Sequence, residues 1–544
     1  MRYLGALGTA MVCSVLTACG GGGSSGSGVS GQGYSPYACN SALYEKAKEL
    51  RIYQVMTEAY IDTDGAGYGV GYGTSHHRGD IQGVINSLEY IQSLGMNAIW
   101  LTPVFESVSL SGQDLAADRL DATGYFATNY FSIDPNFGSL DDARELVNKA
   151  HDLGMYVFFD GVFGHFKENA HNYVSPKGIS VSRSGKGQAS TGREAVYPDD
   201  LDFFKEVATY WVSELKIDGW RLDQAYQVPT GAWGEIRQAV ENTSASVSYQ
   251  LAGETVNPLG YMVAEIWDGE SGIASNGYGE TSAPGLCSAF DFPMRYRIVQ
   301  AFAGEEGGYD IRNASTLNDG FATHNVYPSH AVPNGFITNH DLVRFGDLLQ
   351  REGLADPSDS TYWSRYQAVY AFLSAYTGPI TLYYGEEIGD QVDGFDDKVT
   401  GDCVSSGLCD DHVARSTAKI ESLASEPGAS VFSANANQKA LRDRISGLMA
   451  IRKDHPALYL GSRKHIVSNE GEALYVDYKV AGADKVLFVV NVTESSRTLL
   501  LNVNNIDGNT SLTDLESAEE LNAVGNTLTV ELLPLQARFL EVSP

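Results

Sequence analysis

Eight short apolar runs recur along most of the chain, and helical patterns separate them. The runs lie at residues 52–56, 97–101, 156–159, 219–222, 261–264, 288–292, 336–338 and 380–384. Strands that alternate with helices form parallel sheets, because each parallel connection has to cross over one face of the sheet. The count of eight favours a closed (β/α)8 TIM barrel. A doubly wound sheet is the competing topology, but no GxGxxG sequence follows the first run.

Two of the intervening segments have a clear helical period. Residues 80–94 place apolar side chains on one helical face and stop at Gly95, and residues 139–153 repeat this pattern between Ser139 and Gly154. Ser is a preferred helix N-cap and Gly a common stop signal. The sequence therefore predicts helices packed outside the second and third strands.

The pattern changes after about residue 462. Four β-branched or alternating runs follow with Asn, Gly and Asp turns between them, at residues 473–478, 486–492, 498–503 and 527–532. No helical pattern separates these runs, which indicates an antiparallel sheet. We predict a (β/α)8 barrel domain over residues 39–462, a small inserted domain at about 167–200 after the third strand, and a C-terminal antiparallel β-sandwich over residues 463–544.

The first residues read as a targeting segment. Residues 1–19 combine a basic start with an apolar stretch too short to span a bilayer, and 16–19, Leu-Thr-Ala-Cys, resemble a bacterial lipobox. A Gly/Ser-rich tether follows over residues 20–38. We expect an exported protein that is attached to the membrane only through a lipid on Cys19, and Gly20 after that cysteine suggests the outer membrane. An ordinary secretory signal is the alternative.

Charge and cysteines narrow the class of protein further. The net charge of −31 repels polyanions, so nucleic acid is excluded as a partner. Four cysteines lie beyond the targeting segment, an even number that suits disulfides in an exported chain. Cys403 and Cys409 enclose a loop-like stretch and predict a local disulfide, which leaves Cys39 and Cys287 as a pair by elimination.

Acidic side chains follow several of the apolar runs. The carboxyl ends of barrel strands meet at one mouth, so polar residues there converge. Asp223, Glu265 and Asp341 each come directly or shortly after a run. Any one of them alone would be interpreted as a solvated turn residue, but three together indicate a site. Further polar or aromatic residues accompany them: Asp160, His165, Arg221, Trp267 and His340.

These segments, in this order, resemble the four signature regions of the α-amylase family of glycoside hydrolases and transglycosylases. The regions are residues 160–165, 219–223, 264–268 and 338–341. Further similarity lies at residues 79–83, 101–106, 124–125, 133–138 and 378–386, and the resemblance covers about residues 48–544. It implies a barrel enzyme that cleaves α-1,4-glucosidic bonds in starch or maltooligosaccharides.

The resemblance also implies roles for individual residues. Asp223 would be the nucleophile and Glu265 the general acid and base, roughly 5–5.5 Å apart as in retaining enzymes. Asp341 would bind substrate hydroxyls and favour the distorted sugar ring. Asp160 would orient the site, and Trp267 would either line the leaving-group side or pack. Five further residues would bind substrate: Tyr125, His165, Arg221, His340 and Arg344.

One departure from the family pattern concerns calcium. The first region usually has Asn before its His, where this chain has Gly164, so the calcium site to which that Asn contributes is expected to be absent or altered. A different calcium site is expected in the loop after the first strand, which resembles a calcium loop of related enzymes and offers hard oxygen ligands. Its residues would be Asp62, Asp64, Gly79 and Asp80.

Other functions stay open at this point. An α-glucan transglycosylase, similar to cyclodextrin glucanotransferases, would use the same covalent intermediate with a sugar acceptor in place of water. A non-catalytic glucan-binding surface lipoprotein is a third reading, against which the retention of Arg221 and all three acids argues.

Overall fold

The computed structural model describes residues 33–69, 76–107, 120–188, 191–304, 311–392, 414–420 and 432–542. The predicted targeting segment and the predicted Cys403–Cys409 disulfide lie outside these residues. Within them, no helix is long and apolar enough to cross a membrane.

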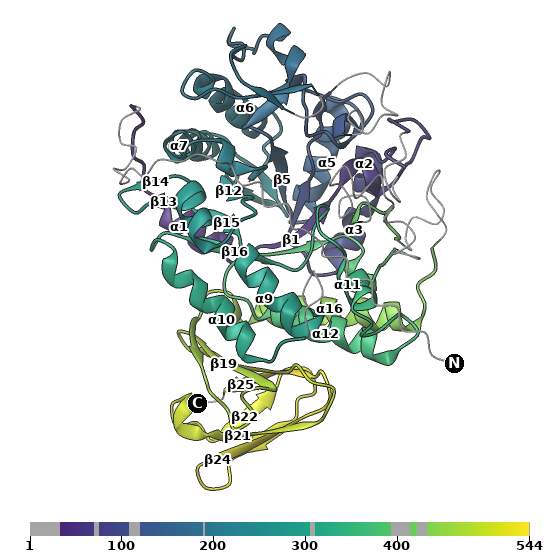
Figure 1. Cartoon of the computed structure of the whole chain (residues 1–544), viewed down its shortest axis with the longest axis vertical. Coiled ribbons are helices and arrows are strands. Elements are labelled where there is room, and N and C mark those ends of the chain that lie inside the picture. The colour runs from purple at the N-terminus through teal and green to yellow at the C-terminus, as the bar shows by residue number, and fades with distance from the viewer. Residues whose placement is uncertain are drawn as a thin grey trace, which may run out of the picture.

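A closed barrel of eight parallel strands forms the centre of the molecule, as predicted (Figure 1). The strand order is β1-β17-β16-β15-β12-β9-β5-β2, so neighbours along the chain are neighbours around the barrel. Its strands are β1 (Arg51–Val55), β2 (Ala98–Leu101), β5 (Tyr156–Gly161), β9 (Gly219–Leu222), β12 (Tyr261–Ala264), β15 (Ser288–Phe290), β16 (Val332–Phe336) and β17 (Ile380–Tyr383).

The seventh strand lies earlier than the apolar pattern predicted. It covers Val332–Phe336, and the predicted run at 336–338 begins at its last residue. Asn334 is fully buried inside the barrel, where its amide nitrogen donates to the Tyr261 hydroxyl at 3.3 Å and its oxygen accepts from Thr381 Oγ1 at 3.0 Å. Because barrel strands can bury a hydrogen-bonded polar side chain, a purely apolar pattern misplaced this strand.

Helices cover the outside of the barrel. The two predicted helices are α3 (Ile81–Ser93) and α5 (Leu140–Asp152), the latter with a capping box at Ser139. Gly95 and Gly154 follow them with φ of 82° and 77°, the left-handed conformation in which glycine ends a helix. The other long helices are α6 (Leu201–Glu214), α7 (Thr230–Ser246), α9 (Phe292–Phe302), α10 (Ser315–Thr323), α12 (Ser360–Ser374) and α16 (Ala436–Asp454).

Shorter elements build the mouth of the barrel, where the carboxyl ends of the strands lie. A three-stranded sheet follows β5 directly, in the order β6-β8-β7, and forms part of the predicted insert. The elements at this end are α2 (Thr57–Tyr60), β3 (Phe105–Glu106), β4 (Asn129–Ile133), β6 (His165–Lys167), β7 (Gly187–Gln188), β8 (Gly192–Glu194) and α11 (Phe345–Arg351).

The C-terminal part is an antiparallel β-sandwich, drawn in yellow below the barrel in Figure 1. A six-stranded sheet, β18-β19-β20-β25-β22-β23, packs over the two-stranded sheet β21-β24 around one apolar core. Helices α10 and α12 lie against it. Its strands are β18 (Ser462–His465), β19 (Leu474–Ala481), β20 (Asp484–Asn491), β21 (Arg497–Asn502), β22 (Ser511–Asp514), β23 (Glu520–Asn522), β24 (Thr527–Leu532) and β25 (Ala537–Val542).

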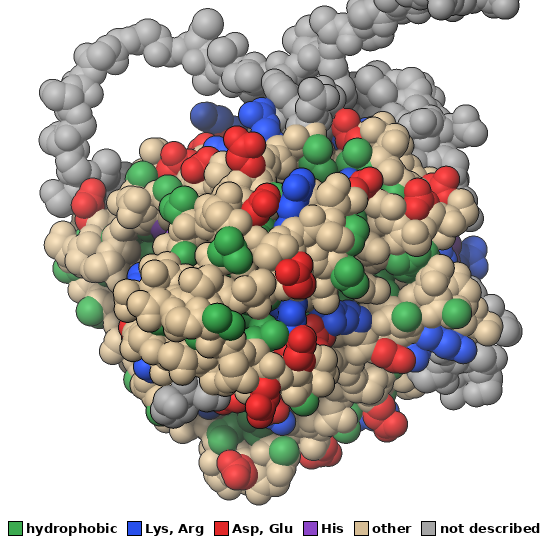
Figure 2. Space-filling model, turned by 90° about the horizontal axis from the view of Figure 1, so that it is seen from below, with side chains coloured by type: hydrophobic (Ala, Val, Ile, Leu, Met, Phe, Trp, Pro, Cys, Tyr) green, Lys and Arg blue, Asp and Glu red, His purple; other side chains and the backbone are tan. Residues whose placement is uncertain are grey.

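The surface on the side of the C-terminal domain is mixed in chemistry. Figure 2 shows acidic side chains scattered over this face among hydrophobic and basic ones. On this face the acidic side chains do not gather into a single patch.

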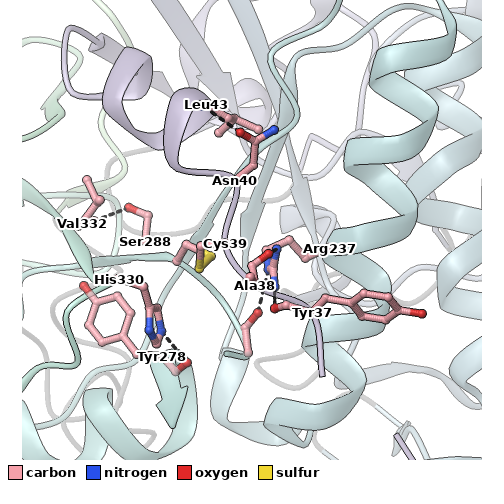
Figure 3. The surroundings of a disulfide bond; sticks show 12 residues. Tyr37, Ala38, Cys39, Asn40, Leu43, Arg237, Tyr278, Ser288, His330 and Val332 are labelled. Carbon is pink, nitrogen blue, oxygen red and sulfur yellow. Dashed lines mark hydrogen bonds between the residues drawn. A yellow bond between two sulfur atoms is a disulfide. The ribbon is translucent and has the colours of Figure 1, made fainter. Parts of the chain in front are cut away.

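The N-terminal segment 33–40 is fastened to the barrel, and we call it the N-terminal strap. Cys39 forms a disulfide with Cys287, as predicted. The Arg237 guanidinium on α7 donates to the carbonyls of Tyr37 at 2.6 Å and Ala38 at 3.1 Å (Figure 3). The strap is therefore part of the folded domain up to α1 (Ser41–Ala47).

Candidate active site

Four barrel strands bring carboxylates to the same end of the barrel. Asp160 is the fifth residue of β5, Asp223 directly follows β9, Glu265 directly follows β12, and Asp341 lies in the loop after β16. The first three are nearly inaccessible, with exposed fractions of 0% for Asp160, 6% for Asp223 and 5% for Glu265. Burial of this many carboxyls requires counter-charges and hydrogen bonds.

The Arg221 guanidinium lies at the centre of these acids. It is on β9, in register with Asp160 on the neighbouring strand β5. Arg221 Nη1 lies 2.9 Å from both oxygens of Asp160 and 3.1 Å from Asp223 Oδ1, and Nη2 lies 2.7 Å from Glu265 Oε1. One cation therefore joins the predicted nucleophile to the predicted acid. Glu265 Oε2 also accepts a hydrogen bond from the backbone N–H of Gln224 at 3.0 Å.

The acids around Arg221 compete for protons. Burial raises the pKa values of Asp160, Asp223 and Glu265 to about 7, although Arg221 acts in the opposite direction on each. Three carboxyls share one guanidinium, so they titrate together and the group keeps a proton near neutral pH. Both oxygens of Asp160 accept from Arg221 Nη1, and Oδ2 also accepts from the Tyr125 hydroxyl, so Asp160 has the most hydrogen bonds to these two side chains of the three acids.

The side chains of Tyr125 and His340 lie beside these acids and bind each other, and Tyr125 also binds Asp160. The Tyr125 hydroxyl lies 2.9 Å from Asp160 Oδ2 and 2.7 Å from His340 Nε2, and the two rings are parallel within 7°. Gln54 on β1 donates its amide N–H to His340 Nδ1 at 2.8 Å, which leaves the ring proton on Nε2. Burial lowers the pKa of His340 to about 3, so this imidazole is neutral. Sequence reasoning missed Gln54, which stands inside an apolar run.

Asp341 is the fourth acid at this end of the barrel, and it pairs with a second cation, Arg415. Its Oδ1 lies 2.8 Å from Arg415 Nη2 and its Oδ2 lies 3.2 Å from His340 Nε2. Burial opposes ionisation of Asp341, but His340, Arg415 and Arg221 outweigh it and hold the pKa below its usual range. The pKa values of Asp223 and Glu265 are both raised by the Asp341 charge, so the three acids lie within electrostatic range of each other. Sequence reasoning missed Arg415, which belongs to no motif.

His165 lies at the edge of the group with both ring nitrogens occupied. Nδ1 lies 2.9 Å from Gln227 Oε1, and Nε2 lies 3.1 Å from the Tyr125 carbonyl. A sugar hydroxyl would have to displace one of these partners. Gln227 also fills the space next to Gly164, where a Cβ atom would come within 2.2 Å of its Oε1. The absence of a side chain at Gly164 thus leaves room for Gln227.

The structure places Arg344 apart from the central acids, with its Nη1 3.4 Å from Glu386 Oε1, and its contact with substrate stays a prediction. Its side chain is fully buried, with Nη1 donating to the Tyr384 carbonyl at 2.8 Å and Nε to Ser416 Oγ at 3.2 Å. Its guanidinium also covers the rings of Tyr383 and Tyr384. Arg344 therefore fixes the end of β17 to the segment around Ser416 and faces no open space.

Two exposed aromatic residues follow the central acids. Trp267, two residues after Glu265, is 48% exposed, stacks on Phe292 and donates its indole N–H to the Tyr296 hydroxyl at 2.7 Å. Tyr226, three residues after Asp223, is 52% exposed. Fixed aromatic surface of this kind suits contact with the apolar face of a sugar.

The predicted calcium loop also lies together in space. The carboxylates of Asp62, Asp64 and Asp80 each offer one oxygen, and these oxygens lie within 4.8 Å of one another. Asp80 also caps α3 and accepts from Thr63, at 2.7 Å from its backbone N–H. Gly79 has no room for a side chain, because a Cβ atom would come within 2.1 Å of the Thr57 carbonyl oxygen.

Taken together, a parallel barrel with a cluster of carboxylates around one arginine, at the mouth formed by the carboxyl ends of its strands, defines a barrel enzyme of the glycoside hydrolase type. The family model described as "Alpha amylase, catalytic domain" matches residues 54–182 and 198–459. The chain belongs to the alpha-amylase family.

Individual relatives support this assignment. The chain is 27% identical over 336 residues to a cyclomaltodextrinase of Thermoanaerobacter pseudethanolicus, a match that covers 57% of this chain and 51% of the relative. It is 25% identical over 532 residues to neopullulanase 2 of Thermoactinomyces vulgaris, covering 91% and 78%. The chain thus spans about half the length of the first of these relatives.

Solved structures include a more similar protein. The crystal structure of AmyP in complex with maltose has a TM-score of 0.86 and 51% sequence identity, and the match covers 93% of this chain and 99% of that one. A Glu-to-Gln variant of AmyP in complex with maltotriose has a TM-score of 0.87 at the same identity. The Geobacillus thermoleovorans α-amylase, with 20% identity and a TM-score of 0.69, shares the fold.

Proposed function

We propose that this protein hydrolyses α-1,4-glucosidic bonds in starch or maltooligosaccharides by a retaining, two-step mechanism. The observation that carries the proposal is that Asp223 and Glu265 contact the two nitrogens of one guanidinium, Arg221. A nucleophile and a proton donor on the same cation are close enough to act on one glucosidic bond. The complexes of AmyP with maltose and maltotriose support a maltooligosaccharide as substrate.

In the first step, Asp223 attacks the anomeric carbon and Glu265 protonates the departing glucosidic oxygen. Asp223 Oδ1 is held by Arg221, while its Oδ2 has no hydrogen-bond partner among the described residues and is free to attack. The raised pKa of Glu265, about 7, suits a group that has to be protonated at rest. This step gives a glucosyl ester of Asp223 and releases the leaving sugar.

In the second step, water replaces the ester. Glu265, now ionised, takes a proton from water, which attacks the same carbon from the opposite side to Asp223. Two inversions give a product with the original α configuration. Asp341, kept ionised by Arg415 and Arg221, is proposed to bind hydroxyls of the same glucosyl unit and to stabilise its positive charge in the transition state.

Digestion of maltoheptaose tests this proposal. We expect new reducing ends, products shorter than the substrate, and the α anomer as the first product seen by NMR. Glu265→Gln keeps the shape of the side chain but cannot donate a proton, so kcat should fall by at least about 1,000-fold. Undiminished turnover in this variant would contradict the mechanism. Longer or cyclic products would instead indicate a transglycosylase, and binding without any turnover would indicate a glucan-binding protein.

We further propose a structural calcium ion at Asp62, Asp64 and Asp80. Three carboxylate oxygens within 4.8 Å of one another are the donor set that a hard cation takes. Asp62 and Asp64 follow α2 and Asp80 caps α3, so an ion there would hold together two parts of the connection from β1 to β2. Chelation with EGTA should lower the Tm, and calcium but not sodium should restore it. An unchanged Tm would contradict the proposal.

We also propose that the protein is exported and carries a lipid on Cys19. The Cys39–Cys287 disulfide supports export, because such bonds persist in oxidising compartments. Metabolic labelling with a fatty acid should mark the wild-type chain and not the Cys19→Ser variant. Labelling of both, or of neither, would contradict the lipid, and cell fractionation would show whether the outer membrane holds the protein.

A further inference from the structure

Residues 414–420, which we call the Arg415 segment, lie across the end of β17. The Tyr383 hydroxyl donates to the Ala414 carbonyl at 2.8 Å, and the Tyr384 hydroxyl donates to the Ser416 carbonyl. The backbone on both sides of Arg415 is therefore fixed by consecutive tyrosines of the barrel. These two hydrogen bonds do not involve the Arg415 side chain.

The Arg415 side chain binds the loop after β16 at two points. Nη2 lies 2.8 Å from Asp341 Oδ1, and Nε donates to the His340 carbonyl at 3.2 Å. Arg415 is only 3% exposed and Asp341 is itself largely buried. Contacts to both the side chain and the adjacent backbone fix the orientation of the Asp341 carboxylate. His340 holds the other oxygen at 3.2 Å, so neither oxygen rotates freely.

The charges around Asp341 explain why a second cation is needed. Asp223 and Glu265 repel it, and Arg221 is already shared among Asp160, Asp223 and Glu265. Burial raises the pKa of Glu58 on α2, and the Arg415 charge acts in the opposite direction, so Arg415 also acts on this buried acid. The neutral His340 supplies a hydrogen bond and no charge. Arg415 is thus the guanidinium that balances Asp341 within this acid-rich group.

We propose that Arg415 is a positioning residue for Asp341. It keeps this carboxylate ionised and oriented, so that the proton shared by the cluster of buried carboxyls resides on Glu265. The inference rests on the proposed function, because it concerns which acid carries the proton needed for leaving-group departure. Without Arg415, repulsion from Asp223 and Glu265 would move the proton toward Asp341. The enzyme would then lose both the anion that binds the sugar and the protonated acid.

Steady-state kinetics on maltoheptaose across pH tests this inference. Arg415→Met removes the charge but keeps the length of the side chain, and we expect kcat/KM to fall about 100-fold, as for a misplaced catalytic group. The acid limb of the kcat/KM profile should move to higher pH, because Asp341 then protonates more readily. Arg415→Lys keeps the charge, so the limb should stay near its wild-type position and much of the activity should return.

Lys419→Gln is the matched control. Lys419 lies on the same segment but pairs with Asp390 and not with Asp341. Replacing Lys419 loosens the segment but leaves the contacts of Asp341 in place, so the acid limb of the kcat/KM profile should not move. A limb shift equal to that of Arg415→Met would show that loosening alone is responsible and would overturn the inference. Equal impairment of Arg415→Lys and Arg415→Met, or a limb that moves in neither, would also overturn it.

A double-mutant cycle keeps the test decisive if Arg415→Met does not fold. Arg415→Gln, a neutral but polar variant, should lower kcat/KM clearly in the wild-type background and have little further effect in an Asp341→Asn background, because its partner there has no charge left to hold. The same effect in both backgrounds would contradict the inference. The wild-type enzyme alone decides the proposed function: absence of maltoheptaose hydrolysis there refutes the activity, whereas the ratios between variants decide the role of Arg415.

Discussion

At the scale of single residues, the site depends on a few polar atoms that each serve two partners. The Tyr125 hydroxyl is one of them, because it joins Asp160 to the neutral ring of His340. Through Asp160 it acts on Arg221, and through His340 it acts on Asp341. A single hydroxyl thus connects the two halves of the acid group.

We predict that Tyr125→Phe lowers kcat/KM on maltoheptaose by about 10- to 100-fold, because a hydrogen bond to a charged group contributes about 1.5–3 kcal/mol. Tyr90→Phe is the matched control, since the Tyr90 hydroxyl bonds another buried acid, Glu387, at 2.9 Å outside the site. That variant should lose stability and keep its kinetics. Equal kinetic losses in both variants would show that the effect is general loosening.

At the scale of elements, the amino-acid pattern predicted most of the frame and part of the site. Strand β12 is a short run of apolar and aromatic residues with no charged or amide side chain, so its bounds could be predicted. Strand β16 could not, because Asn334 is buried and paired across the barrel. The sequence did not predict the roles of Arg415 and Gln54 for a related reason. These roles arise from contacts between segments that are distant in the chain, which no local pattern indicates.

The N-terminal strap is an element whose contribution to stability can be measured. It runs beside α7: Tyr34 packs on Gly231, the Ser35 N–H donates to Glu235 at 3.1 Å, and the Arg237 contacts come next. Order along the strap thus matches order along the helix. The disulfide of Cys39 closes a loop with a sequence separation of 248 residues.

We predict that replacing Cys39 and Cys287 by Ser lowers the free energy of unfolding by about 2–4 kcal/mol, chiefly by releasing a constraint on the unfolded chain. Thermal unfolding of the double variant measures this change; serine variants are preferable to a reductant, which would also reach Cys403 and Cys409. Because the strap contacts none of the central acids, kcat on maltoheptaose should stay within twofold. A loss of activity at full stability would contradict this account.

At the scale of the whole molecule, the fold buries many carboxyls, and they are of two kinds. Burial raises the pKa values of Glu58 and Asp347 to about 8 and that of Glu386 to about 7. For Asp477 burial acts in the same direction, but His465 and Arg463 outweigh it and its pKa is lowered. The first kind binds protons more tightly in the folded state than in the unfolded chain, and the second kind less tightly.

These two kinds have opposite effects on stability. A raised carboxyl pKa stabilises the folded state fully at pH values below its unfolded value of about 4, and this contribution is lost as pH rises through the folded value, at about 1.4 kcal/mol per pH unit and group. A carboxyl with a lowered pKa stabilises the folded state at pH values above about 4, and this contribution is lost as pH falls through the folded value. Since the raised groups are more numerous around the barrel mouth, we predict that Tm falls between about pH 5 and pH 8.

A matched pair of variants separates these contributions. Asp347 is buried with one oxygen, Oδ2, without a hydrogen-bond partner among the described residues, so Asp347→Asn removes its titration at little cost in packing. In this variant the decline of Tm toward pH 8 should be shallower. Asp477→Asn should instead lower Tm by a nearly constant amount between pH 5 and pH 8, because the charge it loses is present throughout that range. Identical pH dependence in the two variants and the wild-type protein would show that the buried carboxyls do not govern the stability of the whole molecule.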